Sequence, residues 1–199
     1  MNNWDNRYKN SEYIYGKEPN QFFKQEIMKL KPGKLLLLGE GEGRNGTFAA
    51  KKGWNVDAVD LSEVGREKAA KLSRSQNVIF NYIIDDVVNF TPDTDKFDVI
   101  ALIYLHLKKD EKEIVFRKIK HGLKKDGKLI LEVFDHDQLK HSSGGPKEIE
   151  LLYSLEEIVE LCIDFEFDYF AKEIITLNEG THHLGEAAVI RFVGTKNNK

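Results

Sequence analysis

A glycine-rich segment that follows an apolar run is the part of the sequence best suited to hold a ligand. Residues 39–46 read Gly-Glu-Gly-Glu-Gly-Arg-Asn-Gly and come directly after four leucines. Glycines let the backbone turn sharply and let a ligand approach with no Cβ in the way. A helix that begins after this turn directs its first N–H groups at the same place. Asp60 lies 21 residues beyond Gly39, at the end of the next predicted strand, where a carboxylate can accept hydrogen bonds from ribose hydroxyls.

Two classes of nucleoside ligand fit this turn. Residues 41–46 match G-x-G-x-x-G, the dinucleotide fingerprint, and residues 39–43 match G-x-G-x-G, the turn typical of S-adenosylmethionine enzymes. Asp86 ends the following strand, where its carboxylate can accept a hydrogen bond from an adenine amino group. A dinucleotide enzyme would need a substrate domain and a hydride-transfer acid–base pair, for which 199 residues leave little room. We therefore favour the methyl donor and keep an NAD-dependent oxidoreductase as the alternative.

Three residues are candidates for catalysis beside such a donor. Tyr15 belongs to an aromatic amino-terminal segment and could face a sulfonium, because the π-face of a ring attracts cations. His106 follows the fourth predicted strand, and His182 precedes the last one together with His183. Each also has a purely structural interpretation, such as anchoring a segment or lining the surface. The histidines and Cys162 show no compact zinc-type spacing, so we predict no metal.

Strand and helix patterns alternate along the chain and place these residues at one edge of a sheet. The predicted helices run from about Asn45 to Gly53, from Ser62 to about Ser73, from a capping box at Asp110 and Glu113 to Lys124, and over 154–163. Predicted strands cover 35–38, 55–60, 78–84, 97–104, 129–134, 165–175 and 187–194. Parallel neighbours need crossover connections, whereas the last two strands lack a helix-sized spacer. The pattern predicts an α/β fold with a doubly wound, mostly parallel seven-stranded sheet and an antiparallel edge strand.

Composition limits the other possibilities. Thirty basic and 33 acidic residues give a formal charge of −3, which argues against affinity based on neutralising nucleic-acid phosphates. One cysteine cannot form an internal disulfide, which suits a reducing cytoplasm. The amino terminus lacks the apolar core of a signal peptide, and no apolar run approaches about 18 residues. We expect a cytoplasmic protein with no membrane or nucleic-acid partner, one domain over residues 1–199 and a lid formed by residues 1–30; the oligomeric state stays open.

Several of these segments together resemble a known family. The elements LLLLGEGEGRN, VDAVDLS, IIDDVVNF, FDVIALIYLHL and LKKDGKLILEVF occur in the order and at the spacing of class I S-adenosylmethionine-dependent methyltransferases. The opening W-D-x-R-Y with YIYGKEPN, the segment SSGGPKEIELLYSLEE and the end EGTHHLGEAAVIRF resemble the tellurite-resistance (TehB-like) small-molecule branch. The resemblance extends from Trp4 to Lys196.

The resemblance implies a Rossmann-like methyltransferase fold, S-adenosyl-L-methionine as cofactor, and a small-molecule acceptor such as a thiol or a tellurium or selenium oxyanion. The strand-four end IYLHL differs from the D/N-P-P-Y/F of enzymes that methylate base amino groups. Leu37 replaces a carboxylate that many members use to hold the methionine ammonium, which keeps a cofactor-binding protein without catalysis as a further alternative. The implied cofactor contacts are Gly39, Glu40, Gly41 and Gly43 for methionine, Asp60 for ribose, Leu61, Asp86 and Val87 for adenine, and Ile103 and Tyr104 beside the sulfonium.

Overall fold

A mixed seven-stranded sheet forms the centre of the computed structural model, which describes residues 3–10 and 12–197. Residues 1–2, 11 and 198–199, which fall in the predicted domain and lid ranges, lie outside this part. The strand order is β3-β2-β1-β4-β5-β7-β6. The strands are β1 (Lys34–Leu38), β2 (Asn55–Asp60), β3 (Asn81–Ile84), β4 (Phe97–Ile103), β5 (Leu123–Phe134), β6 (Phe165–Glu179) and β7 (His183–Lys196).

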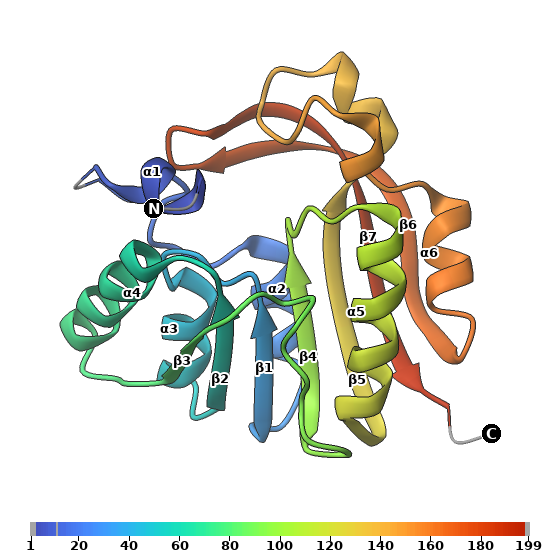
Figure 1. Cartoon of the computed structure of the whole chain (residues 1–199), viewed down its shortest axis with the longest axis horizontal. Helices are drawn as coiled ribbons and strands as arrows, with labels where there is room; N and C mark the ends of the chain where they lie inside the picture. Colours follow the sequence, from blue (N-terminus) through green and yellow to red (C-terminus); the bar gives the residue numbers. More distant parts are fainter. Residues whose placement is uncertain (1–2, 11, 198–199) are drawn as a thin grey trace.

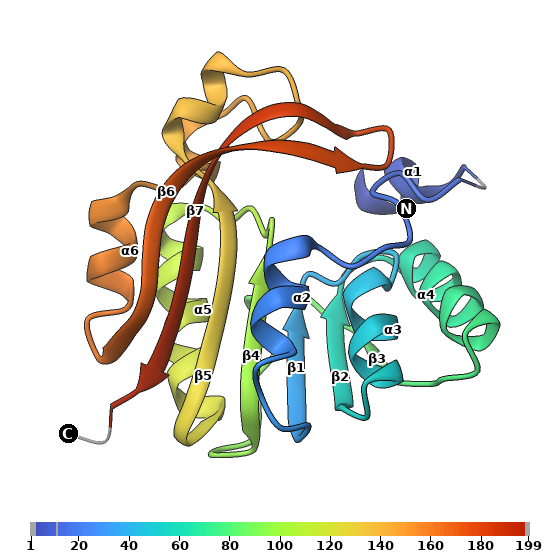
Figure 2. The same cartoon turned by 180° about the vertical axis from the view of Figure 1, so that it is seen from behind.

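Strands β1 to β5 pair in parallel, and β7 is antiparallel to both of its neighbours, β5 and β6. The predicted fold class is thus confirmed, with β6 as the edge strand and β7 as the strand that reverses direction. Helices cover both faces, as Figures 1 and 2 show from opposite sides. They are α1 (Asn3–Tyr8), α2 (Gln21–Ile27), α3 (Arg44–Lys51), α4 (Glu63–Ser75), α5 (Lys109–Gly122) and α6 (Leu155–Leu161).

The four leucines of β1 divide between the two faces of the sheet. Leu35 and Leu37 pack in a cluster with Phe23 of α2 and Ala49 of α3, and the other two join Phe116 of α5 in a second cluster. Side chains alternate along a strand, so a strand covered on both faces reads as a continuous apolar run. Because β1 ends at Leu38, the glycine-rich turn that follows lies at the carboxyl edge of the sheet.

A serine caps two of the predicted helices, those that start at residues 62 and 154. The Ser62 hydroxyl accepts a hydrogen bond from Gly65 N (2.9 Å), and the Ser154 hydroxyl accepts one from Glu157 N (3.2 Å). The box at Asp110 is wrong, because Asp110 already lies inside α5. The Glu111 carboxylate instead accepts from the backbone N–H of Lys108 (2.8 Å). The helix ends at Gly122 rather than Lys124, since Leu123 begins β5.

The predicted turn before the fifth strand is a bulge within it. Leu123 pairs with Phe97, and the register then shifts so that Lys128 lies opposite Val99. Asp126, between these two pairs, has a φ of +59°, a left-handed conformation that aspartate tolerates better than most residues.

The hairpin of β6 and β7 is longer than the apolar pattern predicted. Its pairing runs on to Glu179 opposite His183, beyond the predicted limits of 175 and 187. In Figures 1 and 2 the hairpin arches over the carboxyl ends of the central strands towards α1. The backbone N–H groups of Thr181 and His182 both donate to the Ile14 carbonyl (3.0 and 3.2 Å). The amino-terminal segment and the hairpin thereby meet over the sheet edge. None of the described helices is long and apolar enough to cross a bilayer.

Candidate active site

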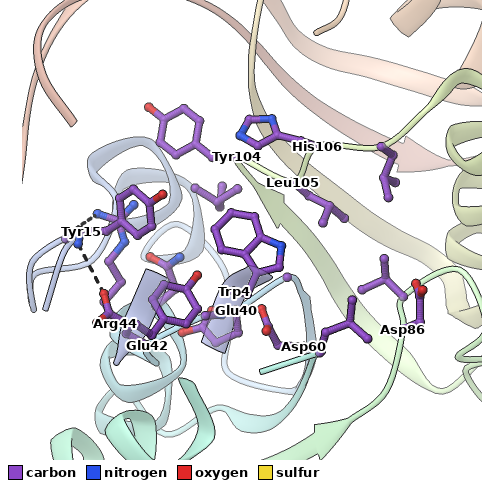
Figure 3. Close-up of a pocket in the computed structure, with 18 of the residues that line it drawn as sticks. Trp4, Tyr15, Glu40, Glu42, Arg44, Asp60, Asp86, Tyr104, Leu105 and His106 are labelled. Carbon is purple, nitrogen blue, oxygen red and sulfur yellow. Dashed lines mark hydrogen bonds between the residues drawn. The ribbon is translucent and has the colours of Figure 1, made fainter. Parts of the chain in front are cut away.

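A cavity of about 220 Å³ opens at the carboxyl ends of β1, β2 and β4. In the view of Figure 3, Glu40, Asp60 and Asp86 lie along one side of it, and Tyr104 and His106 lie along the other. Nine of the ten residues predicted to contact the cofactor line this one cavity: Gly39, Glu40, Gly41, Asp60, Leu61, Asp86, Val87, Ile103 and Tyr104.

Two glycines of the turn are needed for its shape. Gly39 and Gly41 have φ values of +73° and +61°, which disfavour a side chain. A Cβ on Gly41 would lie 2.7 Å from the Tyr8 hydroxyl oxygen, and one on Gly39 would lie 2.8 Å from Leu105 Cδ1. The absent side chains thus let Tyr8 and Leu105 pack against the turn, and both glycines also line the cavity.

Gly43, the tenth predicted contact, does not line the cavity. It precedes α3 with a φ of +89°, and a Cβ there would lie 2.4 Å from the Ala69 Cβ of α4. Its absent side chain permits α3 and α4 to pack closely. Glycine spacing alone cannot separate this packing role from a ligand contact.

Asp60 is buried at the end of β2 and braces the turn. Its two carboxylate oxygens accept hydrogen bonds from Gly41 N and Ser62 N, each at 2.9 Å. Burial raises the pKa of Asp60, and these two N–H groups oppose the rise. The neighbouring Leu61 is 41% exposed while lining the cavity. An acid beside an uncovered apolar side chain matches the two needs of a nucleoside, namely ribose hydroxyls and a flat base.

Glu40 lies deeper in the turn, where its carboxylate accepts a hydrogen bond from Gly46 N (2.7 Å). Burial raises the pKa of Glu40 to about 8. Leu37, at the position where many relatives carry an acid, packs in the core under the sheet. Glu40 is thus an acid of the turn itself that reaches the cavity.

Aromatic rings form a continuous wall on the other side, made of Trp4, Tyr8, Tyr15, Tyr104, His106, Phe134 and His183. Ring centroids are 5.6 Å apart for Trp4 and Tyr8, and 6.4 Å apart for Tyr8 and Tyr15. His183 continues the series at 4.5 Å from Tyr15 and 4.7 Å from Tyr104. Phe134 packs behind, against Tyr104 (4.5 Å) and His106 (5.8 Å). The Tyr8 end of this aromatic wall lies against Gly41 of the glycine turn, and Tyr104 and His106 lie on the opposite side of the cavity.

The predicted catalytic residues divide between the cavity and the surface. Tyr15 and His106 line the cavity, whereas His182 is exposed and lies outside it. His183 lines the cavity instead, because β7 begins there and successive side chains of a strand point to opposite faces. His183 Nδ1 lies 3.4 Å from a Glu179 carboxylate oxygen. Burial lowers the pKa of His183, and the hydrogen bond with Glu179 opposes that effect.

His106 follows β4 and is half-buried in the wall of the cavity. Burial lowers its pKa to about 3, so the ring is neutral over the physiological range. Its Nδ1 atom is buried and has no hydrogen-bond partner in the described part of the chain. The ring stacks on Phe134 with an interplanar angle of 15°.

The comparisons with known proteins agree with this geometry. A family model described as a methyltransferase domain matches residues 35–127, the stretch that carries the turn, Asp60, Asp86 and Tyr104. Residues 35–127 carry a methyltransferase domain. The predicted resemblance to class I methyltransferases, the enzyme class and the cofactor are confirmed: the domain is that of an S-adenosylmethionine-dependent methyltransferase. The TehB-like branch stays a prediction. The NAD-dependent alternative finds no support.

Individual relatives are distant in sequence. An uncharacterized methyltransferase of Staphylococcus carnosus is 25% identical over 147 residues, which cover 73% of this chain and 66% of the relative. TehB from Haemophilus influenzae superposes with a TM-score of 0.72 at 14% identity, covering 98% of this chain and 66% of TehB. A second structure is described by the conversion of a disulfide bond into a thioacetal group during echinomycin biosynthesis. It superposes with a TM-score of 0.76 at 14% identity, covering 98% of this chain and 91% of the other. These structures are similar in fold.

A polar network beneath the aromatic wall of the methyltransferase domain escaped the sequence analysis. Glu132 of β5 is fully buried and accepts hydrogen bonds from the Tyr104 hydroxyl (2.5 Å), Asn20 Nδ2 (2.6 Å) and Arg191 Nε (2.6 Å). The sequence did indicate this network, since Glu132 is the one charged residue in the apolar run LILEVF. A charge inside a buried strand needs partners, and here they come from three other segments of the chain.

A second ion pair links the glycine turn to the hairpin tip. Arg44, at the start of α3, donates to the Glu179 carboxylate (2.8 Å) and to the Tyr15 carbonyl (3.0 Å). Burial alone would raise the pKa of Glu179, yet His183 and Arg44 together bring it below its ordinary value. The described residues contain no group of three or more side chains suited to a metal.

Proposed function

We propose that the protein transfers a methyl group from S-adenosylmethionine to the chalcogen atom of a small molecule, either a thiol or a tellurium or selenium oxyanion. The observation that carries the proposal is the convergence of nine predicted cofactor contacts on one cavity opposite an aromatic wall. The hairpin and residues 14–16 meet above this cavity, which leaves room for a small acceptor. The strand-four end IYLHL also speaks against a nucleic-acid base as acceptor.

The residues present fit the cofactor. The turn at Gly39 and Gly41 offers bare backbone to the methionine part, Asp60 offers a carboxylate to the ribose, and Leu61 offers an uncovered apolar face to the purine. Asp86, Val87, Ile103 and Tyr104 line the same cavity, and we assign the first two to the adenine edge and the last two to the methyl position. When bound, the cofactor supplies a methyl group already activated by its sulfonium, so that the protein has mainly to orient the acceptor in line and exclude water.

His183 is the side chain best placed to take a proton from the acceptor. Glu179 lies beside its Nδ1 atom (3.4 Å), which favours a tautomer with the proton on Nδ1 and leaves Nε2 free to accept. A thiol that loses its proton to Nε2 becomes the stronger nucleophile. Tyr15 and His106 line the same cavity, and their predicted catalytic roles stay proposals.

Residues 1–30 are proposed to act as a cover that is part of the same domain. The Asp5 carboxylate in α1 accepts a hydrogen bond from the Ser62 hydroxyl at the start of α4 (2.7 Å). Tyr8 follows in α1 and reaches Gly41. Sulfur as the acceptor atom accords with the description of the neighbour from echinomycin biosynthesis, which names a disulfide and a thioacetal.

Calorimetry and a transfer assay test the proposal together. S-adenosylhomocysteine, the demethylated cofactor, should bind with a 1:1 ratio, whereas NAD should not bind. Labelled methyl groups should then pass from S-adenosylmethionine to members of a panel of thiols, selenite and tellurite. No binding of the demethylated cofactor at millimolar concentration would defeat the proposal. Binding without transfer to any member would favour a cofactor-binding protein without catalysis.

A further inference from the structure

The described residues that line the cavity offer no free positive charge to an acceptor. Among the described residues that line it, Arg44 is the one with a permanent positive charge. Its guanidinium is buried and already bound to the Glu179 carboxylate and the Tyr15 carbonyl. Arg7 approaches from outside, where it is exposed, lies over the Trp4 ring (4.9 Å) and donates to the Tyr15 hydroxyl (3.1 Å). Its charge is therefore at the rim and in contact with solvent.

Acidic groups dominate the rest of the lining. Five carboxyl side chains line the cavity, namely Glu40, Glu42, Asp60, Asp86 and Glu111. Glu42 is neutralised by Lys68 at 2.6 Å, and burial keeps Glu40 protonated over much of the neutral range. The remaining acids still leave this lining with more negative than positive charge. An added anion would meet repulsion and no partner.

Both imidazoles of the aromatic wall are neutral. Burial lowers the pKa of His106 and that of His183. Neither ring is then an imidazolium that could bind an oxyanion at neutral pH. The other members of the wall are tyrosine, tryptophan and phenylalanine rings, whose faces pack against apolar and aromatic groups.

We propose that the acceptor is a thiol on an uncharged apolar or aromatic body, and that oxyanions and thiols with an anionic body are excluded. This proposal rests on the proposed function and selects one of its two acceptor classes. The sulfonium of the bound donor can offset one negative charge, that of the thiolate formed when the S–H proton passes to His183 Nε2. The S–CH₃ bond of the donor breaks as the new S–C bond forms, giving a methyl thioether and the demethylated cofactor. A second negative charge on the acceptor would have to enter before that proton moves, when the described side chains of the lining offer it no free cation, which is unfavourable.

A matched pair of acceptors tests the proposal directly. 4-(Mercaptomethyl)benzamide and 4-(mercaptomethyl)benzoate share nucleophile and shape and differ in charge. We expect kcat/KM for the amide to exceed that for the carboxylate at least about tenfold, with selenite not methylated. Equal values, a preference for the carboxylate, or faster methylation of selenite would overturn the inference. It would also fail if the demethylated cofactor bound but no neutral thiol was methylated. Absence of cofactor binding would instead defeat the proposed function.

Variants of adjacent residues on β7 provide a second test. His183→Arg places a cation on the cavity side, and Leu184→Arg adds the same charge at a position that is 62% exposed. In the presence of the demethylated cofactor, we expect His183→Arg to shift the ratio of amide to carboxylate affinity at least about tenfold towards the carboxylate. Leu184→Arg should leave the ratio unchanged. Circular dichroism and cofactor titration check that each variant is folded.

His183→Gln keeps this position uncharged. It provides a second test if His183→Arg does not fold. It should retain the preference for the amide even if its turnover falls. An unchanged ratio in folded His183→Arg, or equal shifts in both arginine variants, would contradict an acceptor site next to His183.

Discussion

Tyr104 and Glu132 are joined by two hydrogen bonds across neighbouring strands. The backbone N–H of Tyr104 donates to the Glu132 carbonyl (2.8 Å), and the phenol donates to the Glu132 carboxylate (2.5 Å). Tyr104 has a φ of +56°, a strained conformation for a bulky residue. The pair therefore holds a strained residue at the end of β4, with its ring against His183 in the wall of the cavity.

Glu132→Leu should destabilise the fold strongly. The substitution leaves the Tyr104 hydroxyl, Asn20 Nδ2 and Arg191 Nε without their shared acceptor. We expect a loss of about 3–5 kcal/mol in the free energy of unfolding, measured with urea, because Arg191 becomes a partly buried charge with a broken pair. Glu173→Leu is the control, since Glu173 also binds Arg191 but its side chain is 30% exposed. That loss should stay below about 1 kcal/mol, and equal losses would contradict a central role for Glu132.

Gly144→Ala should reduce methyl transfer while sparing cofactor affinity. Gly144 has a φ of +128°, and a Cβ there would lie 2.7 Å from His183 Cδ2 and 2.6 Å from the His182 carbonyl oxygen. The imidazole would have to move from its place beside Glu179. Since misplacement by about 1 Å can lower a rate about a hundredfold, we expect kcat to fall by one to two orders of magnitude. Steady-state kinetics and titration with the demethylated cofactor measure the two effects separately.

Gly185→Ala separates displacement of His183 from backbone strain. Gly185 also has a positive φ, +109°, but the nearest side-chain atom to its added Cβ is Ser143 Cβ at 3.7 Å. This variant should lose stability without a comparable fall in kcat. If both alanines slow turnover equally, the position of His183 is not what sets the rate.

The sequence predicts the central strands well because they are buried on both faces. The runs at 35–38 and 129–134 are apolar because their side chains are buried. Glu132 is the exception, and it has hydrogen-bond partners inside the fold. The outer half of the β6–β7 hairpin could not be predicted from an apolar pattern. Ile174 and Leu184 there are 57% and 62% exposed, so this part of the hairpin is held by backbone pairing rather than by a buried pattern.

The uncertain start of β7 also explains the error over the two histidines. Whether His182 or His183 faces the cavity depends on a shift of one residue, which reverses every side chain of a strand. Gly43 shows a similar limit: its spacing fits a ligand turn, yet its contact is Ala69. A role that depends on a tertiary contact cannot be predicted from the spacing of residues in the sequence.

Asp60→Asn should weaken cofactor binding, both at the ribose and through the turn, because the amide nitrogen cannot accept the hydrogen bond that one carboxylate oxygen takes from Gly41 N or Ser62 N. The carboxylate lines the cavity at the end of β2, where it would accept hydrogen bonds from ribose hydroxyls. Hydrogen bonds to charged groups contribute about 1.5–3 kcal/mol, so the Kd for S-adenosylhomocysteine should rise about 10- to 150-fold. Asp57→Asn is the matched control: it lies on the same strand, is also buried, and pairs with Lys34 and Lys96. Its Kd should stay within about twofold of the wild type, and a similar rise in both would contradict the assignment.

The stability of the protein should fall as the pH rises between about 4.5 and 8, in part through Glu40. Burial raises the pKa of Glu40 to about 8 from an ordinary value of 4.5. Within this range the folded state keeps a proton that the unfolded chain has released, so each rise in pH favours unfolding by up to about 1.4 kcal/mol per unit. The effect is absent below pH 4.5 and complete above pH 8.

Glu40→Gln isolates this contribution, because its amide cannot ionise while it can still accept from Gly46 N. Burial also raises the pKa of Asp60, and that effect is largely shared by both proteins. We therefore expect the free energy of unfolding of the wild type minus that of the variant to decrease steadily from pH 5 to pH 8, as measured by urea titrations at each pH. A constant or increasing difference would mean that the carboxylate is already ionised in its pocket at neutral pH, with Arg44 or the first N–H groups of α3 as sufficient partners.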